Sequence, residues 1–193
     1  MKKIGLFGGT FDPIHCAHLA IAAKALDVLS LDKVIFIVAG EPPHKSGNYR
    51  TQAQHRLKMV QIAALCNERF EVSDYEIKKQ GKSYSYLTAN HFKKQYPDAG
   101  LYFIIGDEAF RELPTWKFPE KLASLVTFAV FTRDGGDIEV SPTDALSGKF
   151  IKIEIEPIKI SSTAVRERLL RGEDVTGLVP DCVIEYIRKN DLY

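Results

Sequence analysis

The sequence predicts an α/β protein with a parallel sheet, because short β-branched runs alternate along it with longer stretches of helical character. Two of the short runs, residues 34–38 and 101–105, are apolar throughout. This pattern is typical of strands that are buried on both faces of a sheet. At 193 residues the chain can form one substantial core, so we expect a single domain over residues 1–193.

Six strands and six helices are expected along the chain. The strand candidates are rich in β-branched and aromatic residues and span residues 3–8, 33–38, 70–74, 101–106, 126–132 and 150–156. The helix candidates alternate with them and span residues 15–29, 51–66, 83–95, 119–125, 162–170 and 180–189. Either Ser161 or Ser162 can cap the fifth helix, and Gly172 follows its end. Such βαβ units have right-handed crossovers, which place the strands in one parallel sheet.

The composition excludes several classes of protein. Lys and Arg number 26 and Asp and Glu number 25, so the net charge of +1 lacks the basic excess of most nucleic-acid-binding proteins. We therefore expect no nucleic-acid partner. No run of about 18 apolar residues occurs, so we expect no membrane span. Cys16, Cys66 and Cys182 form no CxxC pair, which favours neither a disulfide framework nor a zinc ribbon and suggests a cytoplasmic location.

A candidate phosphate site follows the first expected strand. That strand runs into Gly8 and Gly9, and a helix begins a few residues later. In an open α/β sheet, ligands bind beyond the carboxyl ends of the strands. Glycines let backbone amides approach an anion closely, and the next helix points its positive end at the same place. The segment is neither a Walker A loop nor a GxGxxG motif, so a dinucleotide-using oxidoreductase has little support.

His15 and His18 lie three residues apart at the start of the first helix, so they share one face. Two imidazoles beside a glycine-rich loop can donate N–H bonds to phosphate oxygens. Zinc is a weaker alternative, because the HExxH glutamate and a third ligand are absent. A pair of half-buried structural histidines is the other alternative. The preceding glycine-rich segment favours phosphate binding.

The motifs together resemble a known family. Residues 8–18, GGTFDPIHCAH, are similar to the GGTFDPxHxGH signature of bacterial nicotinate-nucleotide adenylyltransferases, in the HxGH nucleotidyltransferase superfamily. Five further motifs follow in family order, namely PPHK at 42–45, HRL at 55–57, KSYS at 82–85, IIGDE at 104–108 with LPTWK at 113–117, and ISST at 160–163 with Arg166. The resemblance implies a Rossmann-like, doubly wound parallel sheet.

The resemblance also implies a reaction. Members of this family transfer the adenylyl group of ATP to nicotinate mononucleotide, giving deamido-NAD and pyrophosphate in NAD biosynthesis. The attacking phosphate is already an anion, so alignment and charge neutralisation matter more than a general base. The implied partners are ATP and nicotinate mononucleotide. The implied cofactor is Mg²⁺, which would bridge ATP oxygens with few or no direct protein ligands.

Site residues are carried over by motif. His18 would contact the α-phosphate in the transition state, and His15 would assist on the triphosphate. The expected ATP-binding residues are Gly8, Gly9, Thr10, Phe11, Gly106, Glu108, Ser161, Ser162, Thr163 and Arg166. The expected mononucleotide-binding residues are His44, Lys45, Ser85, Trp116 and Lys117.

Each of these groups also has a plainer interpretation. The serines could form a simple helix cap beside a solvated Arg166, residues 44–45 could belong to a solvated loop, and Trp116 could be a core residue. In the family such a Trp stacks on the nicotinate ring, while backbone amides hold the ring carboxylate. Carried over, those amides would belong to Ser85 and to Lys117 or its neighbour.

The chain departs from the family pattern at several positions. Ala17 replaces the glycine of HxGH, so a methyl group would lie where the nucleotide approaches. At the GxD motif, either Glu108 replaces the aspartate or Asp107 serves after a local shift. Ser85 replaces a threonine, and Leu87 stands where an aspartate is common.

These departures leave alternatives open. Nicotinamide mononucleotide or phosphopantetheine could be the acceptor, although PPHK and the Trp116 segment disfavour phosphopantetheine. The chain could also be a nucleotide-binding regulator that has lost turnover. The sequence does not decide the oligomeric state, and a homo-oligomer is compatible with it.

Overall fold

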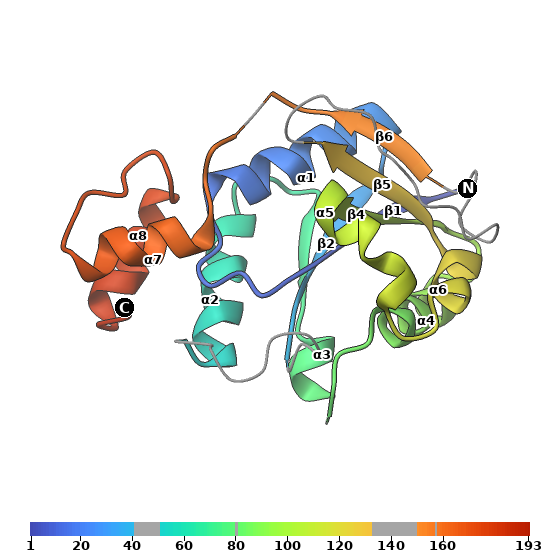
Figure 1. Cartoon of the computed structure of the whole chain (residues 1–193), viewed down its shortest axis with the longest axis horizontal. Coiled ribbons are helices and arrows are strands. Elements are labelled where there is room, and N and C mark those ends of the chain that lie inside the picture. Colours follow the sequence, from blue (N-terminus) through green and yellow to red (C-terminus); the bar gives the residue numbers. More distant parts are fainter. Residues whose placement is uncertain (41–50, 80, 133–149, 157) are drawn as a thin grey trace.

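The computed structural model describes residues 1–40, 51–79, 81–132, 150–156 and 158–193. Within them, parallel strands form one sheet in the order β3-β2-β1-β4-β5-β6 (Figure 1). The strands are β1 (Lys3–Gly9), β2 (Lys33–Val38), β3 (Phe70–Ser73), β4 (Gly100–Gly106), β5 (Thr127–Thr132) and β6 (Phe150–Glu154). All six predicted strands are confirmed to within two residues at each end. The order is that of a Rossmann-like, doubly wound sheet, as predicted.

The six predicted helices are also present. They are α1 (Cys16–Leu29), α2 (Ala53–Ala64), α4 (Ser85–Gln95), α6 (Pro119–Leu125), α7 (Ser162–Leu170) and α8 (Asp181–Lys189). Three short elements were not predicted, namely α3 (Tyr75–Lys78), α5 (Asp107–Arg111) and the 3₁₀ helix η1 (Leu113–Thr115). One turn of helix is too short to show a hydrophobic period, which explains why sequence reasoning missed them. No helix of the described ranges is long and apolar enough to cross a membrane.

Each face of the sheet has its own core. Successive residues of β1 illustrate this, since Leu6 belongs to one cluster of buried side chains and Phe7 to the other. Helices α1, α2, α7 and α8 contribute to the cluster that contains Phe7, whereas α4, α5 and α6 contribute to the one that contains Leu6. Figure 1 shows α7 and α8 beside α2, at the opposite end of the molecule from α4 and α6. Because both faces are covered, the central strands are apolar along most of their length.

The strand order reverses between β1 and β4. From β1 the sheet continues to β2 and β3 on one side, and to β4, β5 and β6 on the other. In such sheets a crevice opens beyond the carboxyl ends of the two strands at the reversal. Here those ends are Gly9 of β1 and Gly106 of β4. The fold therefore brings the first signature and the GDE segment to the same edge.

The ends of α7 follow the expected capping chemistry. Ser161 is the N-cap, because its Oγ accepts a hydrogen bond from the backbone N–H of Ala164 at 3.2 Å. Gly172 follows the helix with a φ of 68°, a left-handed conformation that glycine adopts without steric cost. Of the two serines left open by the sequence, the cap is thus Ser161.

Candidate active site

The two glycines at the end of β1 serve different purposes. A Cβ atom built on Gly8 would meet nothing within 4 Å, so this residue faces open space at the crevice. A Cβ atom on Gly9 would lie 2.8 Å from the ring of Phe11, which folds back over the glycine. Phe11 itself has a φ of 51°. The loop is therefore tightly turned, and its backbone is accessible at Gly8.

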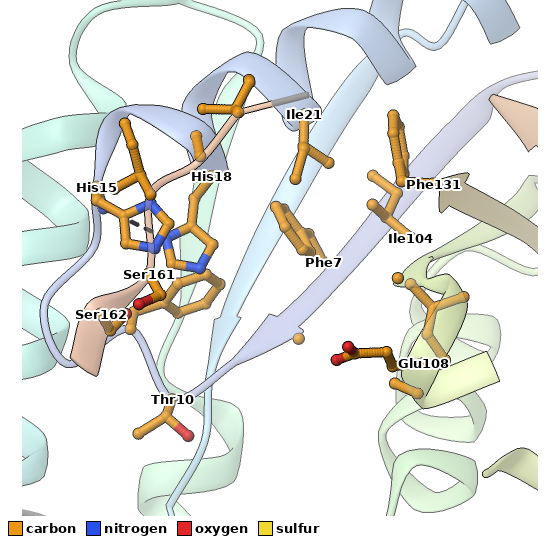
Figure 2. A pocket seen from close by; sticks show the side chains of 18 of the residues that line it. Phe7, Thr10, His15, His18, Ile21, Ile104, Glu108, Phe131, Ser161 and Ser162 are labelled. Atoms are coloured by element: carbon orange, nitrogen blue, oxygen red, sulfur yellow. Dashed lines mark hydrogen bonds between the residues drawn. The ribbon is translucent and has the colours of Figure 1, made fainter. Parts of the chain in front are cut away.

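The histidines form a stacked pair at the start of α1. Their ring centroids lie 3.7 Å apart with 19° between the planes. The backbone N–H of His15 donates to Nδ1 of His18 at 3.3 Å (Figure 2). Because Nδ1 accepts this bond, the neutral His18 ring carries its proton on Nε2. The ring of Phe11 contacts that of His18 edge to face, with the ring centroids 5.0 Å apart. This contact further fixes the orientation of the His18 ring.

A cavity of about 480 Å³ lies beside this pair. Figure 2 shows the two imidazoles on one side and the Glu108 carboxylate pointing in from the other. Predicted ATP-site residues gather around it, namely Gly8, Thr10, Phe11, His15, His18, Gly106, Glu108, Ser161, Ser162, Thr163 and Arg166. The structure thus brings together residues from the first and last motifs of the chain.

The choice between the two acidic residues of the GDE segment has a structural answer. Asp107 begins α5 and forms an ion pair with Arg111 one turn later. Both residues line the cavity, but the side chain of Glu108 points into it without such an ion pair (Figure 2). Of the two alternatives, the structure favours Glu108 as the carboxylate available to a ligand.

The start of α7 is tied directly to the first signature. Ser162 Oγ donates to the backbone oxygen of Pro13 at 3.0 Å. The guanidinium of Arg166 donates from Nη1 to the backbone oxygen of Asp12 at 2.7 Å and from Nη2 to Thr163 Oγ1 at 3.2 Å. A guanidinium has five N–H donors, so donors remain for an anion. Arg166 is therefore not a solvated side chain beside a plain cap.

A second pocket, of about 210 Å³, lies on the other side of the signature loop. Ser85, Trp116 and Lys117, which were predicted for the mononucleotide side, line it. Gly9 was predicted for the ATP side but lines this pocket and not the large cavity, because the end of β1 borders both. The ring of Trp116 packs edge to face on Phe103, with the ring centroids 6.3 Å apart, and Trp116 is half-buried. Ser85 is the first residue of α4, where backbone N–H groups lack partners within the helix. Trp116 thus packs on the core and also borders the pocket.

The two pockets meet at the end of β1. Gly8 and Thr10 line both of them. A phosphate bound in either pocket at this loop would therefore lie close to one bound in the other. The predicted residues His44 and Lys45 lie outside the described residues.

Sequence reasoning missed part of each pocket. Apolar side chains from the sheet and nearby segments complete the large cavity, namely Phe7, Ile21, Ile104, Ile105, Phe131, Ile155, Ile158 and Ile160. Glu76, Ser83 and Thr88 line the smaller one. Thr88 Oγ1 donates to the Glu76 carboxyl at 2.6 Å, and burial raises the pKa of Glu76. Ser83, Ile104, Ile105 and Ile160 lie within the quoted motifs but were given no role in the site. No local motif marks the other positions, because ordinary core residues show the same pattern.

Comparison with known proteins identifies the family. A family model described as cytidylyltransferase-like matches residues 6–168. A Clostridium tetani protein named probable nicotinate-nucleotide adenylyltransferase is 42% identical, with 100% of both chains covered. A Clostridium novyi protein of the same name is 43% identical, again over 100% of both chains. This chain belongs to the nicotinate-nucleotide adenylyltransferase family. The resemblance seen in the motifs is thus confirmed over the full length.

Solved structures agree with this family's fold. The Plasmodium falciparum nicotinic acid mononucleotide adenylyltransferase complexed with NaAD superimposes with a TM-score of 0.82. The match covers 100% of this chain and 98% of that one, at 23% sequence identity. The match therefore supports the doubly wound fold at a level where the sequences have diverged widely.

Proposed function

We propose that this chain transfers the adenylyl group of ATP to nicotinate mononucleotide, giving deamido-NAD and pyrophosphate. The observation that carries the proposal is the meeting of two pockets at Gly8 and Thr10. The larger one has the size and the phosphate-binding groups for ATP, and the smaller one has an aromatic side chain for a pyridine ring. The names and the full-length identity of the clostridial relatives support the same reaction.

The proposed reaction needs no general base. The acceptor phosphate oxygen forms a bond to the α-phosphorus of ATP, and the bond from that phosphorus to the β-phosphate bridging oxygen breaks. Pyrophosphate leaves with the electron pair, so no proton has to be removed from the nucleophile. The protein therefore has to align two anions and neutralise the charge that develops between them.

The groups around the large cavity suit this task. The proton on His18 Nε2 can be donated to an oxygen of the α-phosphate, while His15 holds the His18 ring by stacking. The N-termini of α1 and α7 both border the cavity, and their partial positive charge favours a triphosphate. Arg166 adds a full positive charge on the same side.

The smaller pocket is proposed to bind the pyridine ring of the acceptor and the carboxylate on that ring. Trp116 would stack on the pyridine, and the backbone amides at Ser85 and Lys117 would donate to the carboxylate. We also assign His44 and Lys45 to the mononucleotide phosphate, on the resemblance of the PPHK segment alone. A carboxylate offers two acceptor oxygens to these N–H groups, whereas a carboxamide would place its own NH₂ donor against one of them, which favours nicotinate over nicotinamide.

Mg²⁺ is proposed to arrive with ATP. The described residues hold no cluster of three or more acidic, His or Cys side chains that could bind a metal by themselves. The Glu108 carboxylate that points into the cavity is an oxygen ligand of the kind Mg²⁺ accepts, either directly or through a water. When bound to the triphosphate, the ion would neutralise part of its charge. The three free cysteines also support a reducing compartment such as the cytoplasm.

One observation favours a second candidate function, a nucleotide-binding regulator without turnover. Ala17 lines the large cavity, so its methyl group lies where the family has a glycine. Both histidines and Arg166 nevertheless border the same cavity, which favours the enzyme.

The test is pyrophosphate release with ATP and Mg²⁺, with nicotinate mononucleotide, nicotinamide mononucleotide and phosphopantetheine compared as acceptors. We expect the highest kcat/KM with nicotinate mononucleotide, and deamido-NAD as the product separated by chromatography. If ATP binds but none of the three acceptors leads to pyrophosphate release, the regulator is supported. A higher kcat/KM with either of the other acceptors would overturn the proposed acceptor.

A further inference from the structure

The segment after α8 reaches back to the first signature. The hydroxyl of Tyr193 donates to Oδ1 of Asp12 at 2.5 Å, across 181 positions of sequence. Asp12 is only 4% exposed and lies in the turn between β1 and α1. Neither the motifs nor the reaction accounts for this contact. It joins the far end of the described chain to the loop that carries the phosphate-binding groups.

The Asp12 turn is held from two sides. Arg166 and Ser162, from the start of α7, donate to the backbone oxygens of Asp12 and Pro13. Tyr193 instead donates to the Asp12 side chain. A buried carboxylate is costly unless it accepts hydrogen bonds, so the turn depends on this hydroxyl. Burial and the bond to Asp12 raise the pKa of Tyr193 above its ordinary value, so the phenol keeps its proton and remains the donor.

The turn is coupled to the phosphate-binding histidine. Phe11 precedes Asp12, and its ring packs edge to face on His18 at 5.0 Å. Phe11, Asp12, His15 and His18 all line the large cavity, whereas none of them lines the smaller one. Tyr193 lines neither pocket. A shift of the Asp12 turn would therefore reach the ATP side of the site and leave the acceptor side in place.

We propose that Tyr193 is a positioning residue for adenylyl transfer, because its hydroxyl holds the Asp12 turn and thereby the orientation of Phe11 and His18 toward ATP. The role is indirect, since Tyr193 itself touches neither substrate pocket. This inference rests on the proposed function for its kinetic expectations. The expected change in the Kd of ATP does not depend on which acceptor the protein uses.

The test is Tyr193→Phe, which deletes only the hydroxyl. A matched control is Tyr186→Phe in α8, because the Tyr186 hydroxyl bonds to Nδ1 of His55 at 2.9 Å and lines neither pocket. We expect Tyr193→Phe to lower kcat about tenfold and to raise the Kd of ATP about fivefold, since small displacements of aligned groups are costly. The KM of nicotinate mononucleotide should stay within about twofold. Tyr186→Phe should leave all three constants within about twofold while lowering the melting temperature.

Two results would overturn the inference. The first is a Tyr193→Phe variant with kcat and ATP affinity within twofold of the parent. The second is an equal loss of both in Tyr186→Phe, which would reduce the effect to general destabilisation. If the parent itself releases no pyrophosphate with nicotinate mononucleotide, the proposed function fails instead. The calorimetric Kd of ATP for the two variants then still decides the role of Tyr193.

Discussion

At the scale of single residues, the site depends on how one imidazole is oriented. His18 is fixed by a backbone bond to Nδ1, by stacking on His15 and by the ring of Phe11. Groups held this way need little reorganisation when charge develops in a transition state, so under the proposed function we expect His18 to contribute strongly to the rate. The spacing of the two histidines was visible in the sequence. The bond that selects the tautomer was not, because it depends on the local backbone geometry.

His18→Ala should therefore lower kcat and kcat/KM together, by about 10²-fold or more. Steady-state kinetics with both substrates varied will measure this, and thermal unfolding will check that the fold is kept. A raised KM with unchanged kcat would mean that His18 only binds the ground state.

The ring of Trp116 packs on Phe103 in the core, so a test of ligand stacking must distinguish it from this structural role. Trp116→Ala should raise the KM of nicotinate mononucleotide while the Kd of ATP stays near that of the parent, since the residue lines only the smaller pocket. Kinetics and calorimetry measure the two quantities. Should the melting temperature fall with the acceptor KM unchanged, Trp116 would be a core residue alone.

Ala17 has two opposing effects: it stabilises the helix relative to glycine, but its methyl group lies where the nucleotide would bind. It is nine-tenths or more buried near the start of α1 and lines the large cavity. Ala17→Gly should destabilise the protein by about 1 kcal/mol, the usual difference between these residues in a helix. We expect the Kd of ATP to stay within about twofold, because the other phosphate-binding groups are in place. Tenfold tighter ATP binding would show that the methyl group obstructs the site and would strengthen the case for a regulator.

At the scale of elements, a buried arginine joins three segments around the site. Arg56 of α2 is 1% exposed and donates to the backbone oxygens of Thr10 at 2.7 Å, Ala39 at 2.8 Å and Thr51 at 3.3 Å. These oxygens follow β1, follow β2 and precede α2, respectively. The rigid fork of a guanidinium spreads its five donors over three separate carbonyl groups, a geometry that the compact ammonium of lysine does not reproduce.

Arg56→Lys should lower the free energy of unfolding by about 2 kcal/mol, because buried carbonyl groups lose their donors. Chemical denaturation measures the change. Arg69→Lys is the control, since Arg69 is largely exposed and lies 3.6 Å from Asp27. It should shift stability by less than about 0.5 kcal/mol. Equal effects of the two substitutions would contradict the role given to Arg56.

The success of sequence reasoning also differs between elements. β2 and β4 were predictable because strands covered on both faces are apolar along most of their length. α5 was not, since a helix of five residues carries no readable period, and so the pairing of Asp107 with Arg111, which leaves Glu108 to face the cavity, could not be foreseen. Local motifs located His18 and Trp116. Arg56 and Tyr193 act through partners 46 and 181 positions away, which no local pattern reveals.

At the scale of the whole molecule, the sheet order places both pockets at one edge. Because β1 lies at the reversal of the strand order, the loop that follows it borders pockets on two sides. In the proposed reaction, ATP and its acceptor would bind together in the two pockets, with their phosphates meeting at Gly8 and Thr10. This arrangement requires no covalent intermediate with the protein, so the adenylyl group should pass in a single displacement.

The most direct test of this account is the stereochemical course of transfer at the α-phosphorus. One diastereomer of ATP bearing sulfur on that phosphorus is turned over with nicotinate mononucleotide. The configuration of the dinucleotide product is then assigned by ³¹P NMR. A single in-line displacement predicts inversion. Retention would reveal two successive displacements through a nucleotidyl-enzyme intermediate, and would contradict the direct meeting of the two substrates at the end of β1.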